Sequence, residues 1–151
     1  MKITVDSNIV FSAILNTRSN IGQILTIGSK YFDFYTIDLL KTEILNHKTK
    51  IQNITGFSDA DFYETYNLIN SKIRLVDDKL IPEDVLKLAY NLTYDIDEKD
   101  TVFVALNNHL KSKLWTGDKM LINGLISKGY SGTITTAELY EIFISKVSQN
   151  M

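Results

Sequence analysis

The chain contains no cysteine, a single proline and no long apolar run, and each absence narrows what the protein can be. Without cysteine it can form neither a disulfide framework nor a thiolate metal site, which suits a reducing cytoplasm. No window approaches the roughly 18 consecutive apolar residues of a membrane span, and the N-terminus lacks a basic segment followed by an apolar one. We therefore expect a cytoplasmic protein that neither crosses a membrane nor is secreted.

Excess charge of one sign is also lacking. The 16 basic and 18 acidic residues give a net charge of −2, which argues against the broad basic surface of many nucleic-acid binders. A local phosphate-binding site remains open, because acids that hold divalent cations no longer repel a phosphate. The length of 151 residues and the hydrophobic fraction of 44% suit one folded domain. We place it at residues 1–147, followed by a frayed tail at 148–151.

Strand-like and helix-like segments alternate along the chain. Short apolar or β-branched runs predict strands at 2–6, 32–37, 73–76, 113–116 and 133–135. Helical patterns cover 7–15, 21–29, 38–50, 58–71, 82–92, 98–110, 119–128 and 137–147. We expect Asp38 and Ser58 to cap their helices and Pro82 to open its own. The alternation predicts a single α/β domain, an α/β/α sandwich in which helices flank a mostly parallel central sheet of about four to five strands.

Two aspartates follow predicted strands that are far apart in the sequence. Asp6 ends the first strand and precedes Ser7 and Asn8, whereas Asp118 follows the run Thr116-Gly117. Parallel strands end at the same edge of a sheet, and open α/β sheets bind their ligands at that edge. Each aspartate has a simpler explanation as the N-cap of the following helix.

Three further acids lie on or beside predicted helices. Glu43 borders the apolar face of the 38–50 helix, where a buried carboxylate is costly unless it is paired or bound to metal. The alternative is a glutamate that reaches water from the rim or pairs with a lysine. Asp97 and Asp100 lie near the start of the 98–110 helix, where the helix dipole alone would favour them.

Taken together, Asp6, Glu43, Asp100 and Asp118 predict a metal site. We expect their carboxylates within a few ångströms of one another, where they repel unless a cation compensates their charge. Ligands that are all oxygen suit Mg²⁺ or Mn²⁺ rather than Zn²⁺. The natural chemistry of such a site is hydrolysis of a phosphodiester by metal-activated water.

Four segments resemble, in order, the motifs of the PIN domain family. They are VDSNIVFSAIL at 5–15, LLKTEIL at 39–45, DEKDTVFVAL at 97–106 and LWTGDK at 114–119. The segment TITTAEL at 133–139 is similar to the tail of the toxin-like, VapC-type subgroup. The resemblance spans nearly the whole chain and is weakest over 52–91. Ser7 and Val102 stand where the family more often has threonine and proline, and neither change removes a ligand.

The resemblance implies a Mg²⁺- or Mn²⁺-dependent ribonuclease, often the toxin of a bacterial toxin–antitoxin pair. Its partners would be RNA and a small antitoxin protein that covers the acidic cleft. Carried over by position, the catalytic and metal-binding quartet is Asp6, Glu43, Asp100 and Asp118. Asp97 would be a near neighbour of the metal. The residues that would orient a carboxylate or water are Ser7, Asn8 and Thr116.

A few other residues are candidates for binding substrate. Lys119 adjoins Asp118 and is expected to contact an RNA phosphate. The other lysines near the acidic motifs could also line an RNA path, although ordinary solvated positions explain them; they are Lys41, Lys48, Lys50, Lys111 and Lys113. His47 shares a helix face with Glu43 and is expected at the rim. Four tyrosines at helical spacing predict packing in the core or in a homodimer rather than stacking on bases; they are Tyr63, Tyr66, Tyr90 and Tyr94.

Two other functions fit the same sequence. The domain could be a catalytically weak binding module whose acids hold metal, RNA or a basic protein segment. It could also be a phosphotransfer domain with Asp6 as nucleophile, although a second acid would then be expected beside Asp6. Two histidines in these contexts give no serine-type triad, and the glycines form no phosphate-binding loop.

Overall fold

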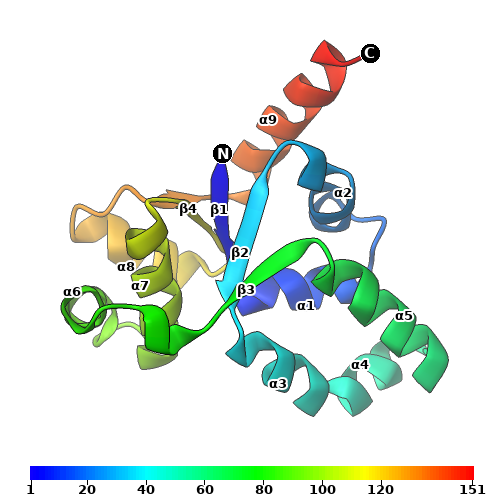
Figure 1. The fold of residues 1–151 in the computed structure, drawn as a ribbon, viewed down its shortest axis with the longest axis horizontal. Coiled ribbons are helices and arrows are strands. Elements are labelled where there is room, and N and C mark those ends of the chain that lie inside the picture. Colours follow the sequence, from blue (N-terminus) through cyan, green and yellow to red (C-terminus); the bar gives the residue numbers. More distant parts are fainter.

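Five parallel strands form the centre of the computed structural model, which describes residues 1–151 (Figure 1). They are β1 Lys2–Val5, β2 Asp33–Ile37, β3 Ile73–Val76, β4 Lys113–Trp115 and β5 Thr133–Ile134. Their order across the sheet is β3-β2-β1-β4-β5, and every neighbouring pair is parallel. The predicted α/β fold with a parallel sheet is confirmed.

Nine α-helices surround the sheet (Figure 1). They are α1 Ser7–Leu15, α2 Asn20–Thr26, α3 Leu39–Asn46, α4 Lys48–Thr55, α5 Asp59–Asn70, α6 Glu83–Thr93, α7 Thr101–Leu110, α8 Lys119–Ser127 and α9 Thr136–Gln149. Three short 3₁₀ turns are η1 Gly28–Lys30, η2 Asp78–Leu80 and η3 Glu98–Asp100. No helix is both long and apolar enough to cross a membrane.

The two faces of the sheet bury separate hydrophobic cores. One core contains Ile3 and Trp115 and is covered by helices that include α1, α2, α5 and α9, whereas the other contains Leu114 and is covered by α6, α7 and α8 (Figure 1). Leu114 and Trp115 are consecutive in β4 and therefore point to opposite faces. Burial on both sides explains why these strands are apolar runs rather than alternating ones.

The connections reverse direction between β1 and β4. From β1 the chain moves outwards to β2 and β3, and it then returns through α6 and α7 to place β4 on the other side of β1. The backbone N–H of Asp6 donates to the carbonyl of Trp115 at 3.0 Å, which joins the two carboxyl ends. The fold thus creates a topological switch point between β1 and β4, where α/β sheets bind ligands.

The prediction of a single helix at 38–50 is wrong. The chain forms α3 and α4 with a break at His47, whose φ of −98° and ψ of 10° leave the helical region. The break turns α4 so that it packs against α1, and Ile51 is buried in the first core. Core packing of Ile51 outweighs the continuous helical pattern that predicted one helix.

The predictions for where helices begin and end are partly correct. Ser58 caps α5 by accepting from the N–H of Asp61, as predicted. Asp38 makes no capping hydrogen bond and is itself in the helical region, so that prediction is wrong. Pro82 lies directly before α6 rather than inside its first turn. The last helix, which was expected to end at 147, continues to Gln149.

Candidate functional site

A polar pocket of about 400 Å³ lies at the switch point. Phe103 is the only hydrophobic residue among those that line it, which are Asp6, Ser7, Asn8, Glu43, His47, Asp97, Lys99, Asp100, Phe103 and Asp118. All four acids of the predicted quartet therefore face one pocket, although they come from four separate segments. Of the other predicted residues, Ser7, Asn8 and Asp97 line the pocket too, whereas Thr116 lies buried behind Asp6.

Asp6 is the buried centre of the site, with 4% of its surface exposed. It follows β1 and precedes α1, so its extended backbone directs the carboxylate across the strand end. Oδ1 accepts from the Ser7 N–H at 2.7 Å, and Oδ2 accepts from the Thr116 hydroxyl at 2.7 Å. Burial raises the pKa of Asp6, and the nearby charge of Asp118 adds to the effect despite these hydrogen bonds.

Thr116 connects the two aspartates that follow β1 and β4. Its hydroxyl donates to Asp6 and accepts from the backbone N–H of Asp118 at 3.1 Å, and the residue is almost completely buried. A hydroxyl has only one proton to donate, so donation to Asp6 leaves its lone pairs for the N–H. This side chain therefore fixes Asp6 and the turn before α8 relative to each other.

Asp118 caps α8 with one oxygen only. Its Oδ1 accepts from the N–H groups of Met120 and Leu121 at 3.0 and 3.2 Å, while Oδ2 makes no hydrogen bond to the protein. The capping explanation for Asp118 is thus correct, but it accounts for half of the carboxylate. The free oxygen belongs to a side chain that lines the pocket.

Asp100 contains the least satisfied atom in the protein. Its Oδ2 is the only buried side-chain nitrogen or oxygen without a hydrogen-bond partner, and the residue makes no capping bond to α7. Burial raises the pKa of Asp100 to about 7, and the charges of Asp6, Asp97 and Asp118 contribute further. A buried acceptor without a partner costs about 1–3 kcal/mol, so the fold alone does not explain this carboxylate.

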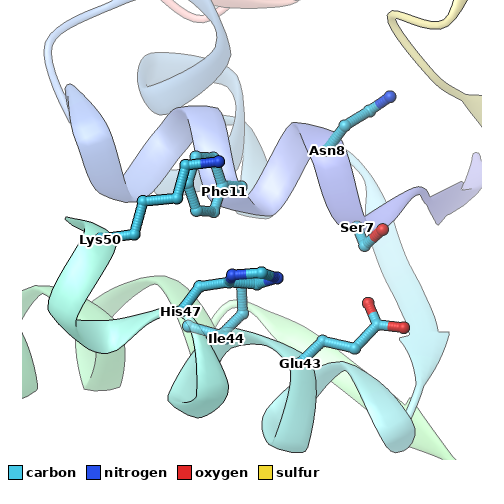
Figure 2. Close-up of a pocket in the computed structure, with 7 residues that line it drawn as sticks. All are labelled: Ser7, Asn8, Phe11, Glu43, Ile44, His47 and Lys50. Carbon is cyan, nitrogen blue, oxygen red and sulfur yellow. The ribbon is translucent and has the colours of Figure 1, made fainter.

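Asp97, which precedes η3, and Glu43, which lies in α3, complete the acidic lining. Asp97 is exposed and accepts from the N–H of Lys99 at 3.0 Å, which caps η3. Glu43 extends from α3 and is partly exposed, and it forms no ion pair with any lysine. Figure 2 shows its carboxylate directed towards the Ser7 side chain on α1.

The carboxylates are less tightly gathered than expected. No three of the quartet have oxygens within 4.8 Å of one another; the only set that does is Asp38, Asp77 and Asp78. That cluster follows β2 and β3, and the strand-end reasoning applied to Asp6 could have found it. Its three members are exposed, and Asp77 already caps η2 through the Lys79 N–H. A cluster of exposed acids is common without any ion.

The donor set of the pocket nevertheless fits a hard divalent cation. Asp6, Asp100 and Asp118 offer carboxylate oxygens, which suit Mg²⁺ or Mn²⁺, and repulsion among them calls for a positive charge. Oδ2 of Asp100 lacks the partner that a cation would supply. Glu43 could join such an ion directly or through water.

The structure brings in other residues that the sequence did not single out. They are Lys99 and Phe103, which line the pocket. His47, which was expected at the rim, is exposed and lines the pocket at the break between α3 and α4. Lys119 is exposed and lies outside the pocket lining. The position of Lys99 between two of the acids, in the segment DEKD, was the available signal for it.

The PIN domain family matches residues 4–140, so this chain belongs to that family. The fold is similar to the crystal structure of PAE2754 from Pyrobaculum aerophilum, with a TM-score of 0.65 and 15% sequence identity. That similarity covers 96% of this chain and 99% of the other. No curated protein gave a significant match. The PIN resemblance of the sequence motifs is confirmed, and PIN domains are generally nucleases that use divalent metals.

Proposed function

We propose that this PIN domain is a Mg²⁺- or Mn²⁺-dependent endoribonuclease that hydrolyses RNA phosphodiester bonds. The observation that carries the proposal is Oδ2 of Asp100, a buried carboxylate oxygen without a partner, in a pocket shared with Asp6 and Asp118. A structural role for three adjacent acids would pair them with cations of the protein, and no lysine or arginine bridges any of them. A ligand of opposite charge supplies the missing partner.

Each acid has a distinct role in this proposal. Asp6, Asp100 and Asp118 would hold the cation, which when bound would supply a Lewis acid for the scissile phosphate and for the attacking water. Glu43 would accept the proton of that water, because it lines the same pocket from α3 and forms no ion pair that would compete. Attack in line with the leaving group yields a 5′-phosphate and a 3′-hydroxyl.

Neighbouring residues position these groups. Ser7 and Thr116 hold the two oxygens of Asp6 in place, so that the carboxylate is oriented before any cation binds. Lys99 lines the pocket and offers a positive charge to the substrate phosphate. Lys119 begins α8 beside Asp118 and contacts a phosphate outside the pocket.

Cleavage of a labelled single-stranded RNA by the purified chain tests the proposal. We expect cleavage in Mn²⁺ that stops in excess EDTA and that Asp6→Asn nearly abolishes while the protein stays folded. Asp78→Asn is the matched control, because it removes an acid from the exposed cluster outside the pocket. Cleavage that persists in EDTA, or equal loss in both variants, would contradict the proposal.

The biological setting that we propose is the toxin half of a toxin–antitoxin pair in the cytoplasm. A pocket this rich in acids suits a basic side chain from a small antitoxin, whose arginine would pair with the carboxylates. Coexpression with the product of a short neighbouring gene tests this role. We expect the two proteins to copurify, whether or not this chain forms a homodimer, and cleavage to fall in the complex.

A catalytically weak binding module is the second candidate. It is favoured by the spacing of the quartet, in which no three carboxylates approach within 4.8 Å. The two functions differ in what Glu43 does. Glu43→Gln should lower the cleavage rate sharply in an enzyme, whereas equal background rates for the variant and the wild type would favour the module.

A further inference from the structure

A second recess of about 230 Å³ adjoins the acidic pocket (Figure 2). It is lined by Ser7, Asn8, Phe11, Glu43, Ile44, His47 and Lys50. Four of these residues also line the acidic pocket, namely Ser7, Asn8, Glu43 and His47. The two hollows therefore form one groove that runs from the carboxylates, between α1 and the α3–α4 break, to Lys50.

The chemistry of the groove changes along its length. Beyond Glu43 the recess contains no further acid and has an apolar wall formed by Phe11 and Ile44. The Lys50 ammonium lies 5.7 Å from the centre of the Phe11 ring, and the His47 ring meets Phe11 edge-on at 6.1 Å. Figure 2 shows the Lys50 side chain extended over this ring. An aromatic surface beside an unpaired cation is the combination that binds a nucleotide.

Lys50 is free to contact a ligand, which is not true of every lysine in the chain. It forms no ion pair, whereas Lys48, Lys87 and Lys128 are each paired with an acid. Lys50 is exposed where it contacts the partly buried Phe11, and cation–π contacts at exposed sites are weak. The ammonium can therefore move from the ring to a phosphate without breaking a strong interaction.

We infer that this recess is a subsite for the nucleotide next to the scissile phosphate in single-stranded RNA. This inference rests on the proposed function, because it uses the acidic pocket as the point of cleavage. The base packs against Phe11 and His47, and Lys50 binds the phosphate of that nucleotide. At about 230 Å³ the recess is smaller than the roughly 300–1,000 Å³ of drug-sized ligand sites, which fits one small group rather than a paired helix.

Charge favours RNA over a protein segment as the occupant. The residues that line the recess but not the acidic pocket include a cation, Lys50, and no acid, which suits the phosphate of a polyanion better than a basic protein segment. Lys50 lines only the recess, and Lys99 lines only the acidic pocket. The residues shared by the two hollows lie between these lysines. One cation is thus available on each part of the groove for a strand that passes the carboxylates.

Steady-state cleavage in Mn²⁺ tests the subsite through Lys50→Ala and Phe11→Leu. We expect each to raise KM about tenfold and to leave kcat within about twofold, because the lost contacts bind substrate away from the reacting phosphate. Lys50→Ala should also reduce the dependence of RNA affinity on salt by about 0.7 in slope, the value for one phosphate contact on a single strand. Lys30→Ala, in η1 before the amino end of β2 and outside both hollows, should change neither quantity.

A binding assay keeps the subsite testable even if the proposed function fails. Fluorescence anisotropy of the same RNA is measured with Asp6→Asn protein and with the Asp6→Asn, Lys50→Ala double variant, after thermal unfolding shows both to be folded. About tenfold weaker binding by the double variant supports the subsite whether or not the wild type cleaves. Equal affinities of the two proteins for RNA overturn the subsite, and so does the absence of binding by either protein. In the steady-state assay, a Lys50→Ala variant that changes kcat alone also overturns it. A recess that instead receives a partner protein would give equal RNA affinities.

Discussion

Replacing Asp100 with asparagine should stabilise the protein without metal and remove its response to metal. The ionised carboxylate is half-buried among Asp6, Asp97 and Asp118, and its Oδ2 has no partner. Asparagine keeps the shape, carries no charge and can donate its amide protons to those neighbours. Under the proposed function, the same change also deprives the cation of one ligand. The substitution should therefore raise stability in the absence of metal and lower the stabilisation by metal. An acid with only a structural role would not show both effects.

The size of the effect follows from the pKa of Asp100. The rise from 3.8 to about 7 corresponds to about 4 kcal/mol for a group fully shielded from water. Because Asp100 is partly exposed, we reduce this penalty to about 1–2 kcal/mol. A raised pKa means that folding favours the protonated acid, so the penalty is absent below pH 3.8 and complete above about pH 7. The apo protein therefore loses stability from this group as the pH rises between those values.

Thermal unfolding in EDTA measures the prediction. For a domain of this size we expect Asp100→Asn to raise Tm by about 2–8 °C at pH 8 and by almost nothing near pH 4. Saturating Mn²⁺ should raise the Tm of the wild type and leave that of the variant unchanged. A variant that is less stable than the wild type in EDTA at pH 8, or a gain that does not vary with pH, would refute the reasoning.

Three further predictions concern the site and the fold. Thr116→Val removes the hydroxyl between Asp6 and Asp118, so urea unfolding should show a loss of about 1–3 kcal/mol and cleavage should fall about 10–100-fold. Mn²⁺ affinity, measured by calorimetry, should be about tenfold weaker at pH 6 than at pH 8, because the proton on Asp100 competes with the cation. Gly22→Ala should lower the free energy of urea unfolding by about 1–3 kcal/mol, because the new Cβ would lie 2.3 Å from the backbone oxygen of Thr17. Gly28→Ala, whose Cβ would meet nothing closer than 3.4 Å, is its control and should cost less.

Much of the fold could be predicted because its strands are buried on both faces. Such strands are apolar runs bounded by polar turns, and all five were located to within about a residue at each end. The break at His47 could not be predicted, because it depends on the packing of Ile51 rather than on local pattern. Asp38 was expected to cap a helix from its residue type, but its backbone already has helical angles.

The positions of the candidate site residues could be predicted where chain topology determines them. Strand-end reasoning placed Asp6 and Asp118 at one edge, and the motif order added Glu43 and Asp100 to the same pocket. Details that depend on side-chain direction were out of reach. The choice of Lys99 rather than Lys119 as the pocket lysine depends on how η3 and α8 begin.

The recess at Phe11 and Lys50 was also beyond the sequence, since it exists only because the chain bends between α3 and α4. The cluster of Asp38, Asp77 and Asp78 shows the reverse limit. Strand ends can gather acids that already have a structural role, as Asp77 does in capping η2.

The most direct test of the central claim is the initial rate of RNA cleavage as Mn²⁺ is titrated into wild-type and Asp6→Asn protein. The account predicts a saturating rise for the wild type, with half-saturation at the Mn²⁺ dissociation constant measured by calorimetry on the same protein. The Asp6→Asn rate should be lower by at least about a hundredfold at every concentration. A wild-type rate that is independent of Mn²⁺, or that Asp6→Asn leaves unchanged, would contradict the claim that these carboxylates form a metal-dependent nuclease site.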